Sequence, residues 1–154
     1  MAQTYQLDKL DRKILSALMA DARLVYTDLA KKLLVSPGTI HQRVAKMEQA
    51  GIIKGSKLVL GLEELGHDVL VLLGLHLTSA KAVPKVLEKL KGFPEVLDAY
   101  YTTGTYALII KVATKSIKDY HHFLLEKLQS IAEIQSTESF ICLDHPIQRD
   151  LQVE

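Results

Sequence analysis

Apolar side chains recur at helical spacing in three short runs within the first fifty residues. In the third run, Ile40, Val44 and Met47 stand three or four positions apart, which predicts a helix with one buried stripe. Ser36 lies just before this run, where a side-chain oxygen can cap a helix, and Gly51 follows it as a C-cap. The third helix is therefore expected between these two residues.

Two earlier runs predict shorter helices that pack against the third. The first is expected at about residues 8–22, with Asp8 and Asp11 near its start, where the helix dipole favours acidic side chains. The second is expected to begin with Thr27 as its N-cap. The apolar positions that these two helices would bury are Leu10, Ile14, Leu15, Leu18, Leu29, Ala30 and Leu33.

Residues 27–51 together predict a helix-turn-helix, the shape that places one helix in the major groove of DNA. The polar side of the third helix carries hydroxyl, amide and cationic groups of the kinds that bind base edges and phosphates. A polar helix face is more often only a solvated face, so the shape alone does not decide the function. The residues expected to contact DNA are Ser36, Thr39, His41, Gln42, Arg43 and Lys46, the last five of them as exposed side chains.

The distribution of charge favours the DNA interpretation. Residues 1–60 hold ten Lys and Arg against five Asp and Glu, whereas residues 61–154 hold nine against thirteen. The net charge of +1 for the whole chain hides this asymmetry. A basic domain on a nearly neutral chain is the expected footprint of a phosphate-bearing partner.

The chain is long enough for two modest domains, with 154 residues of which 48% are apolar. We expect a DNA-binding domain at residues 1–52, a linker with a short strand at 53–67, and a second domain at 68–154. The linker strand is expected because apolar side chains cluster there, namely Ile52, Ile53, Leu58, Val59 and Leu60.

Other features narrow the class of protein. The longest apolar run, Val69–Leu75, is too short to span a bilayer, and the first residues lack the pattern of a secretory signal. The single cysteine, Cys142, excludes an internal disulfide and fits a reducing compartment. The sequence therefore predicts a cytoplasmic protein without a membrane partner.

Strands and helices alternate in the second half. Their order, β-α-β-β-α-β, is the split pattern of ferredoxin-like domains, so the predicted fold class is α+β. Ser116, with Asp119 three positions later, predicts the start of the second helix, close to a capping box. The expected elements are strands at 68–77, 95–102, 106–113 and 135–143 and helices at 80–91 and 117–129.

The strand at residues 68–77 is almost continuously apolar, so it is expected to be buried on both faces. Two helices cover only one face of such a sheet. The strands carry more apolar side chains than this one covered face can bury, among them Val71, Leu73, Leu75, Ile109 and Ile141. The open face should therefore meet a second copy of the chain, which predicts a homodimer.

Catalytic chemistry is not indicated by the sequence. No nucleophile elbow, phosphate-binding loop or paired-carboxylate motif stands out. We therefore expect no catalytic residue, no metal and no cofactor. The histidines show no spacing typical of a zinc site; they are His41, His67, His76, His121, His122 and His145.

The chain resembles the Lrp/AsnC family of regulators, in which a winged helix-turn-helix precedes a β-α-β-β-α-β sensor domain. The resemblance covers almost the whole chain, and its specific parts are residues 7–15, 29–33, 35–53, 99–106 and 133–139. The last two segments resemble the asparagine-responsive AsnC branch most closely. Many family members carry an acidic residue just after the glycine that matches Gly104, whereas this chain has Thr105, which also fits that branch.

The resemblance implies dimers that assemble further, commonly as octamers of four dimers, with a small amino acid bound between dimers. The matching effector positions are Tyr100, Thr102, Thr103, Gly104 and Tyr106, with Gln135, Ser136 and Thr137 approaching from an adjacent subunit. Gly104 would let a ligand approach the backbone, and threonine hydroxyls can both donate and accept hydrogen bonds. These residues alone favour a ligand site and a plain hairpin turn equally; the resemblance favours the site.

The sequence thus predicts a regulator that binds double-stranded DNA at a palindromic operator and responds to a small amino acid, with asparagine favoured. Two alternatives stay open. Sirohaem decarboxylases share this two-domain shape, so the fold alone does not exclude an enzyme. The chain could also be an amino-acid-binding regulatory subunit of an enzyme, with the helical unit docking protein. The basic third helix favours DNA over both.

Overall fold

The computed structural model describes residues 5–153, and the contacts within it divide the chain into two compact units. The first unit holds the residues up to Val59 together with the segment that starts at Ile147, and the second unit is Leu60–Pro146. The sequence had assigned this C-terminal segment to the second domain. It packs with the first unit because Val153 adds an apolar side chain to a small helical core, and Ser16 Oγ donates to the Val153 carbonyl at 3.3 Å.

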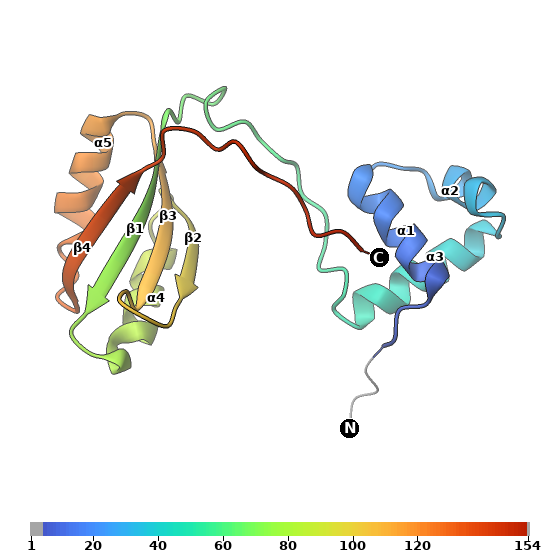
Figure 1. The fold of residues 1–154 in the computed structure, drawn as a ribbon, viewed down its shortest axis with the longest axis horizontal. Helices are drawn as coiled ribbons and strands as arrows, with labels where there is room; N and C mark the ends of the chain where they lie inside the picture. Colours follow the sequence, from blue (N-terminus) through green and yellow to red (C-terminus); the bar gives the residue numbers. More distant parts are fainter. Residues whose placement is uncertain (1–4, 154) are drawn as a thin grey trace. The chain divides into compact units, whose positions relative to one another are not determined.

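Three helices form the first unit: α1 (Lys9–Ala20), α2 (Tyr26–Leu33) and α3 (Pro37–Gln49) (Figure 1). Asp8 and Asp11 lie at the start of α1 as predicted, where they also form a capping box that was not predicted. The predicted apolar stripes meet in one core, whose buried members are Ile14, Leu15, Leu29, Ala30, Ile40, Val44 and Met47. The other predicted core positions, Leu10, Leu18 and Leu33, are partly buried against it.

The start of α2 differs from the prediction. Its N-cap is Val25, which makes no side-chain capping bond, and Thr27 lies inside the first turn. Thr27 is therefore not the N-cap. Asp28 supplies a negative charge to this first turn, where the helix dipole favours it.

Both ends of α3 lie close to where the sequence predicts them. Ser36 Oγ accepts a hydrogen bond from the Thr39 backbone N–H at 3.1 Å, and Pro37 occupies the first helical position. The C-cap is Ala50 rather than the predicted Gly51, which follows it with φ +72°, a conformation that favours glycine. The Ile52 N–H then closes the end of the helix on the Met47 carbonyl at 2.9 Å.

The linker carries no strand within the described part of the chain, contrary to the prediction. A lone extended segment needs a partner for its backbone groups, and residues 53–61 have none in the described sheet. Their apolar side chains are exposed, with Leu58 68%, Val59 81% and Leu60 61% accessible. A turn follows the extended segment at residues 62–66, where the His67 N–H donates to the Leu62 carbonyl at 2.8 Å.

The second unit is one antiparallel sheet in the order β2-β3-β1-β4, which is the predicted ferredoxin-like topology (Figure 1). Its strands are β1 (Val69–Leu77), β2 (Val96–Tyr101), β3 (Leu108–Thr114) and β4 (Ile134–Ile141). Its helical segments are η1 (Ala80–Ala82), α4 (Val83–Lys91), α5 (Ile117–His122) and η2 (Phe123–Leu128). Ser116 caps α5 as predicted, accepting from the Asp119 N–H at 3.1 Å.

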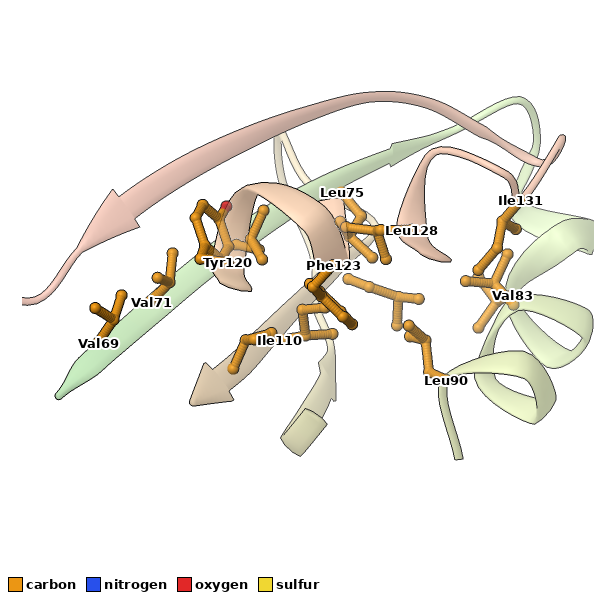
Figure 2. Packing of buried hydrophobic residues seen from close by; sticks show 14 residues of the cluster. Val69, Val71, Leu75, Val83, Leu90, Ile110, Tyr120, Phe123, Leu128 and Ile131 are labelled. Atoms are coloured by element: carbon orange, nitrogen blue, oxygen red, sulfur yellow. The ribbon is translucent and has the colours of Figure 1, made fainter. Parts of the chain in front are cut away.

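The helices bury one face of the sheet. Figure 2 shows Tyr120, Phe123 and Leu128 packed over β1 and β3, with Val83 and Leu90 of α4 completing the cluster. The sequence predicted one continuous α-helix at 117–129, but η2 is a π-helix. Its wider turn brings side chains five positions apart to one face, so Phe123 and Leu128 both reach the core.

The other face of the sheet stays open in a single chain. Along β1, Val71, Leu73 and Leu75 face the helices and are fully buried, whereas Leu72 points the other way and is 39% exposed. The strand is therefore buried on one face only, not on both. Ile109 also lies on the open face, because it pairs with Gly74.

Candidate functional sites

The polar side of α3 presents three exposed side chains from the predicted DNA-contact set: His41, Gln42 and Lys46. Thr39 was expected to be exposed but is half-buried, because its Oγ1 hydrogen-bonds Ser36 Oγ at 2.9 Å as part of the cap. The sequence did not indicate the contact that orients His41. Its ring packs edge-on against Tyr26, with ring centroids 4.6 Å apart.

Arg43 differs most from its predicted environment. Its side chain is 30% exposed rather than free in solvent, and its guanidinium pairs with Asp8 and with Asp11, the latter at 3.0 Å. The hydrogen bonds to these two carboxylates raise the pKa of Arg43, and the bond from Arg43 lowers the pKa of Asp8. Burial, and then its hydrogen bond to Asp11, raises the pKa of Tyr5.

A cavity of about 240 Å³ lies beside the turn between β2 and β3. Thr102 and Gly104 of the predicted effector set line it, and Thr103 does not. The turn is held by Thr102, whose Oγ1 donates to the Tyr106 carbonyl at 2.7 Å, while Gly104 adopts φ +108°. The other lining residues, which the sequence did not single out, are His76, Leu77, Ser79, Ala80, Tyr101, Thr105 and Ala107.

Tyr106 points away from this cavity and covers Gly74 on the open sheet face. A Cβ on Gly74 would come within 2.5 Å of the ring, so a glycine is required there. The Tyr106 hydroxyl donates to Glu138, which raises the pKa of Tyr106. His76 contributes both to the cavity, which it lines, and to the cluster around Tyr106, where the two ring centroids are 5.0 Å apart.

The remaining effector positions lie elsewhere on the sheet. Tyr100 pairs with Ile109 on the open face. Residues 135–137 belong to β4, where Ser136 pairs with His76 of the cavity wall, but none of the three lines the cavity in the single chain. Their approach from an adjacent subunit stays a prediction.

A larger hollow of about 540 Å³ lies between α4 and the edge strand β2. Its lining is mostly apolar, and its charged groups are already paired. Glu88 pairs with Lys91, and Asp98 lies 3.9 Å from Lys111. The smaller cavity, with hydroxyl groups and open backbone at Gly104, is therefore the better match for a small zwitterion.

Residues 5–153 show neither of two further features, a metal-binding cluster and a membrane-spanning helix. These residues include no group of three His, Cys, Asp or Glu side chains placed to hold a metal ion. They also include no helix with the length and apolar character needed to cross a membrane.

The first unit is a basic helix-turn-helix, and the second is a ferredoxin-like domain with a small polar cavity. This combination defines a class of protein: DNA-binding regulators with a ligand-binding domain. Comparison with known proteins agrees. Residues 7–54 match a family model described as winged helix-turn-helix DNA-binding, and residues 68–151 match the Lrp/AsnC ligand binding domain. The chain belongs to the Lrp/AsnC family.

Individual relatives cover nearly the whole chain. The regulatory protein AsnC of Haemophilus influenzae is 50% identical over 148 residues, covering 96% of this chain and 99% of the relative. The solved structure of Escherichia coli AsnC has 51% identity and a TM-score of 0.92, covering 96% of this chain and 99% of that one. A Neisseria meningitidis transcriptional regulator in complex with L-Met shares the fold at 24% identity, with a TM-score of 0.88 and 97% coverage of both chains.

The chain is thus a transcriptional regulator that binds DNA through its helix-turn-helix and carries a ligand-binding domain of the Lrp/AsnC type. Its curated relatives are named as regulatory proteins, not enzymes. These findings favour the regulator over both alternatives that the sequence left open.

Proposed function

We propose that this regulator reads an imperfectly palindromic operator with α3 and that a small amino acid, asparagine first, controls its action. The observation that carries the proposal is the exposed polar face of α3 on a basic unit. Helices of this kind enter the major groove, where amide and hydroxyl groups distinguish base edges.

Within this face, each residue has an expected task. Gln42 and Thr39 reach base edges, and Lys46 is shared between a base and a phosphate. Ser36 and His41 complete the contact set at the start of the helix. Arg43 belongs to the set predicted from the sequence, but its pairing with two carboxylates favours another role.

The effector site is proposed at the cavity beside Thr102 and Gly104. A zwitterion needs donors for its carboxylate and acceptors for its ammonium. The hydroxyls of Thr105 and Ser79 can supply both, whereas Thr102 Oγ1, which donates to the Tyr106 carbonyl, can accept. The resemblance to the AsnC branch favours asparagine. The Neisseria regulator, whose structure is a complex with L-Met, supports an amino acid on this fold.

Assembly links the two activities in this proposal. Dimers join as an octamer of four dimers, and Gln135, Ser136 and Thr137 of a neighbouring subunit close the effector site. Tyr100, Thr103 and Tyr106 then face the interfaces between chains. A ligand held between dimers changes DNA binding only by favouring one arrangement of dimers over another, and DNA must change the ligand's affinity by the same factor.

Operator binding tests the proposal, starting with DNA from the chain's own upstream region. Gln42→Ala should reduce the preference for the operator over unrelated DNA roughly tenfold, because one base contact is worth about 1–3 kcal/mol of discrimination. Lys46→Ala should weaken binding to all sequences and reduce the slope of log affinity against log salt by about one. Adding asparagine should shift the operator affinity of the parent.

Glu48→Gln is the control, since Glu48 is an exposed side chain about 120° around the axis of α3 from Gln42. It should leave the discrimination between sequences unchanged. If Gln42→Ala and Lys46→Ala both bind like the parent across the salt titration, α3 is not the reader.

A further inference from the structure

Arg43 lies in the middle of α3, yet its guanidinium is turned toward the start of α1. Its Nη1 donates to Asp11 Oδ1 at 3.0 Å and also to Asp8 Oδ2. The two carboxylates stand 32 and 35 residues earlier in the chain, so this contact joins two helices that are distant in sequence.

Asp11 is the central group of this cluster, because its side chain is only 1% exposed. Its Oδ2 accepts hydrogen bonds from the Tyr5 hydroxyl and from the Asp8 N–H, both at 3.1 Å. Asp8 Oδ1 in turn accepts from the N–H groups of Leu10 and Asp11. The same two carboxylates therefore cap α1 and hold Arg43.

A DNA contact would have to draw Arg43 away from this cluster. A carboxylate as buried as Asp11 is costly to leave without a compensating charge, and breaking such a pair destabilises the fold. Lys46 faces no such cost, since it is exposed and has no ion pair within the described part of the chain. The two cations of α3 are thus in different situations.

The place of Arg43 on α3 shows what the cluster controls. Lys46 follows it by three positions and Gln42 precedes it by one, so anchoring Arg43 fixes the rotation of α3 about its own axis. We infer that Arg43 is a positioning residue: through Asp8 and Asp11 it sets the orientation of α3, and with it the sequence that Gln42 reads, without contacting DNA. This inference rests on the proposed reading of DNA by α3.

Asp11→Asn is the decisive variant, because a buried carboxylate cannot itself contact DNA. Asparagine keeps an oxygen to accept from the Asp8 N–H but removes the charge that holds Arg43. The preference for the operator over unrelated DNA should fall roughly tenfold, the value of about one base contact, with an unchanged salt slope. A purely electrostatic role predicts instead that loss of an acid strengthens binding to all DNA.

Asp8→Ser is the second variant, since serine still caps α1 but removes the other carboxylate. It should also lower discrimination, and it keeps the inference testable if Asp11→Asn unfolds. Operator binding is measured at a temperature at which circular dichroism shows each variant folded. A role in stability alone would then leave discrimination unchanged, and that result in both variants overturns the inference.

Arg43→Met and Lys46→Met form the matched pair. The first should lower discrimination without changing the salt slope, and the second should lower the slope by about one. A slope reduced by about one in Arg43→Met shows a phosphate contact and overturns the inference. If Gln42→Ala retains discrimination while Asp11→Asn loses it, the proposed role of Gln42 fails and that of Arg43 stands.

Discussion

At the residue scale, two glycines shape the ligand-binding domain for different reasons. Gly74 is required by space, because the Tyr106 ring occupies the position that a Cβ would take. Gly104 is required by conformation, since it has φ +108° and open space around the position of a Cβ. A side chain at Gly104 therefore acts through the backbone of the turn rather than by a clash.

Gly104→Val tests the effector site at this residue. Valine disfavours this positive φ by about 1–2 kcal/mol, so the turn should change shape and amino acid binding should weaken strongly. DNA binding should be retained, because α3 belongs to the other unit. The measurement is calorimetry with the twenty amino acids on parent and variant.

Thr103→Val is the control for this experiment, because the exposed Thr103 does not line the cavity. It should bind asparagine like the parent. The site assignment is wrong if the parent binds no amino acid, or if Gly104→Val binds as tightly as the parent.

Features that depend only on residues close together in the chain could be predicted from the sequence. The caps at Ser36 and Ser116 depend on neighbours in the chain. The partners of Arg43 and the ring over Gly74 could not, because they are 32 or more residues away and depend on how elements pack. A glycine inside an apolar strand was the one available signal for the second of these.

At the element scale, the regular helices and strands could be predicted because their apolar positions alternate with the right period. The prediction failed where an element depends on something outside its own pattern. The π-helical η2 depends on the core that Phe123 and Leu128 share, and the linker strand lacks a pairing partner among the described residues. Thr27 resembled a cap, but the N-cap of α2 is Val25, two residues earlier.

The turn before β4 is held to α4 by a charge cluster, which makes a pH-dependent prediction. Glu133 pairs with Lys85 and, at 3.3 Å, with Lys89. The hydrogen bond from Lys85, followed by a backbone hydrogen bond, lowers the pKa of Glu133 to about 2 from an ordinary value of 4.5. The ionised form is therefore favoured in the folded state.

Because this pKa is lower in the folded state, the stabilisation is present above pH 4.5 and is lost as the pH falls toward 2. Thermal unfolding of the parent and Glu133→Gln should differ at pH 7, with the variant less stable, and converge toward pH 2. Glu126→Gln, at an exposed carboxylate with no ion pair among residues 5–153, is the control. A constant difference across this pH range would contradict the prediction.

At the scale of the whole molecule, the open face of the sheet is the main feature that a single chain leaves unexplained. Leu72 and Phe140 are cross-strand neighbours there, 39% and 48% exposed, and Tyr100, 56% exposed, lies on the same face in the edge strand β2. Exposed apolar side chains grouped on one sheet face mark an interface, and a two-fold dimer would use the same face on both copies. Such a dimer can present its two recognition helices about one DNA turn apart, roughly 34 Å or a multiple of it.

The last prediction is that the parent is a dimer or a larger assembly, up to an octamer, and that Leu72→Glu separates it. Glutamate at this position would bury an unpaired charge in the interface, while the half-exposed position spares the fold of the single chain. Light scattering at micromolar concentration should show a smaller mass for the variant. Operator affinity should fall as well, because a monomer binds only one half-site and loses the gain from linked sites. Leu125, which is 45% exposed on the helical side, provides the control: Leu125→Glu should change neither the mass of the assembly nor the operator affinity. A monomeric parent, or a Leu72→Glu variant with the parent's mass, would remove the basis for the palindromic operator.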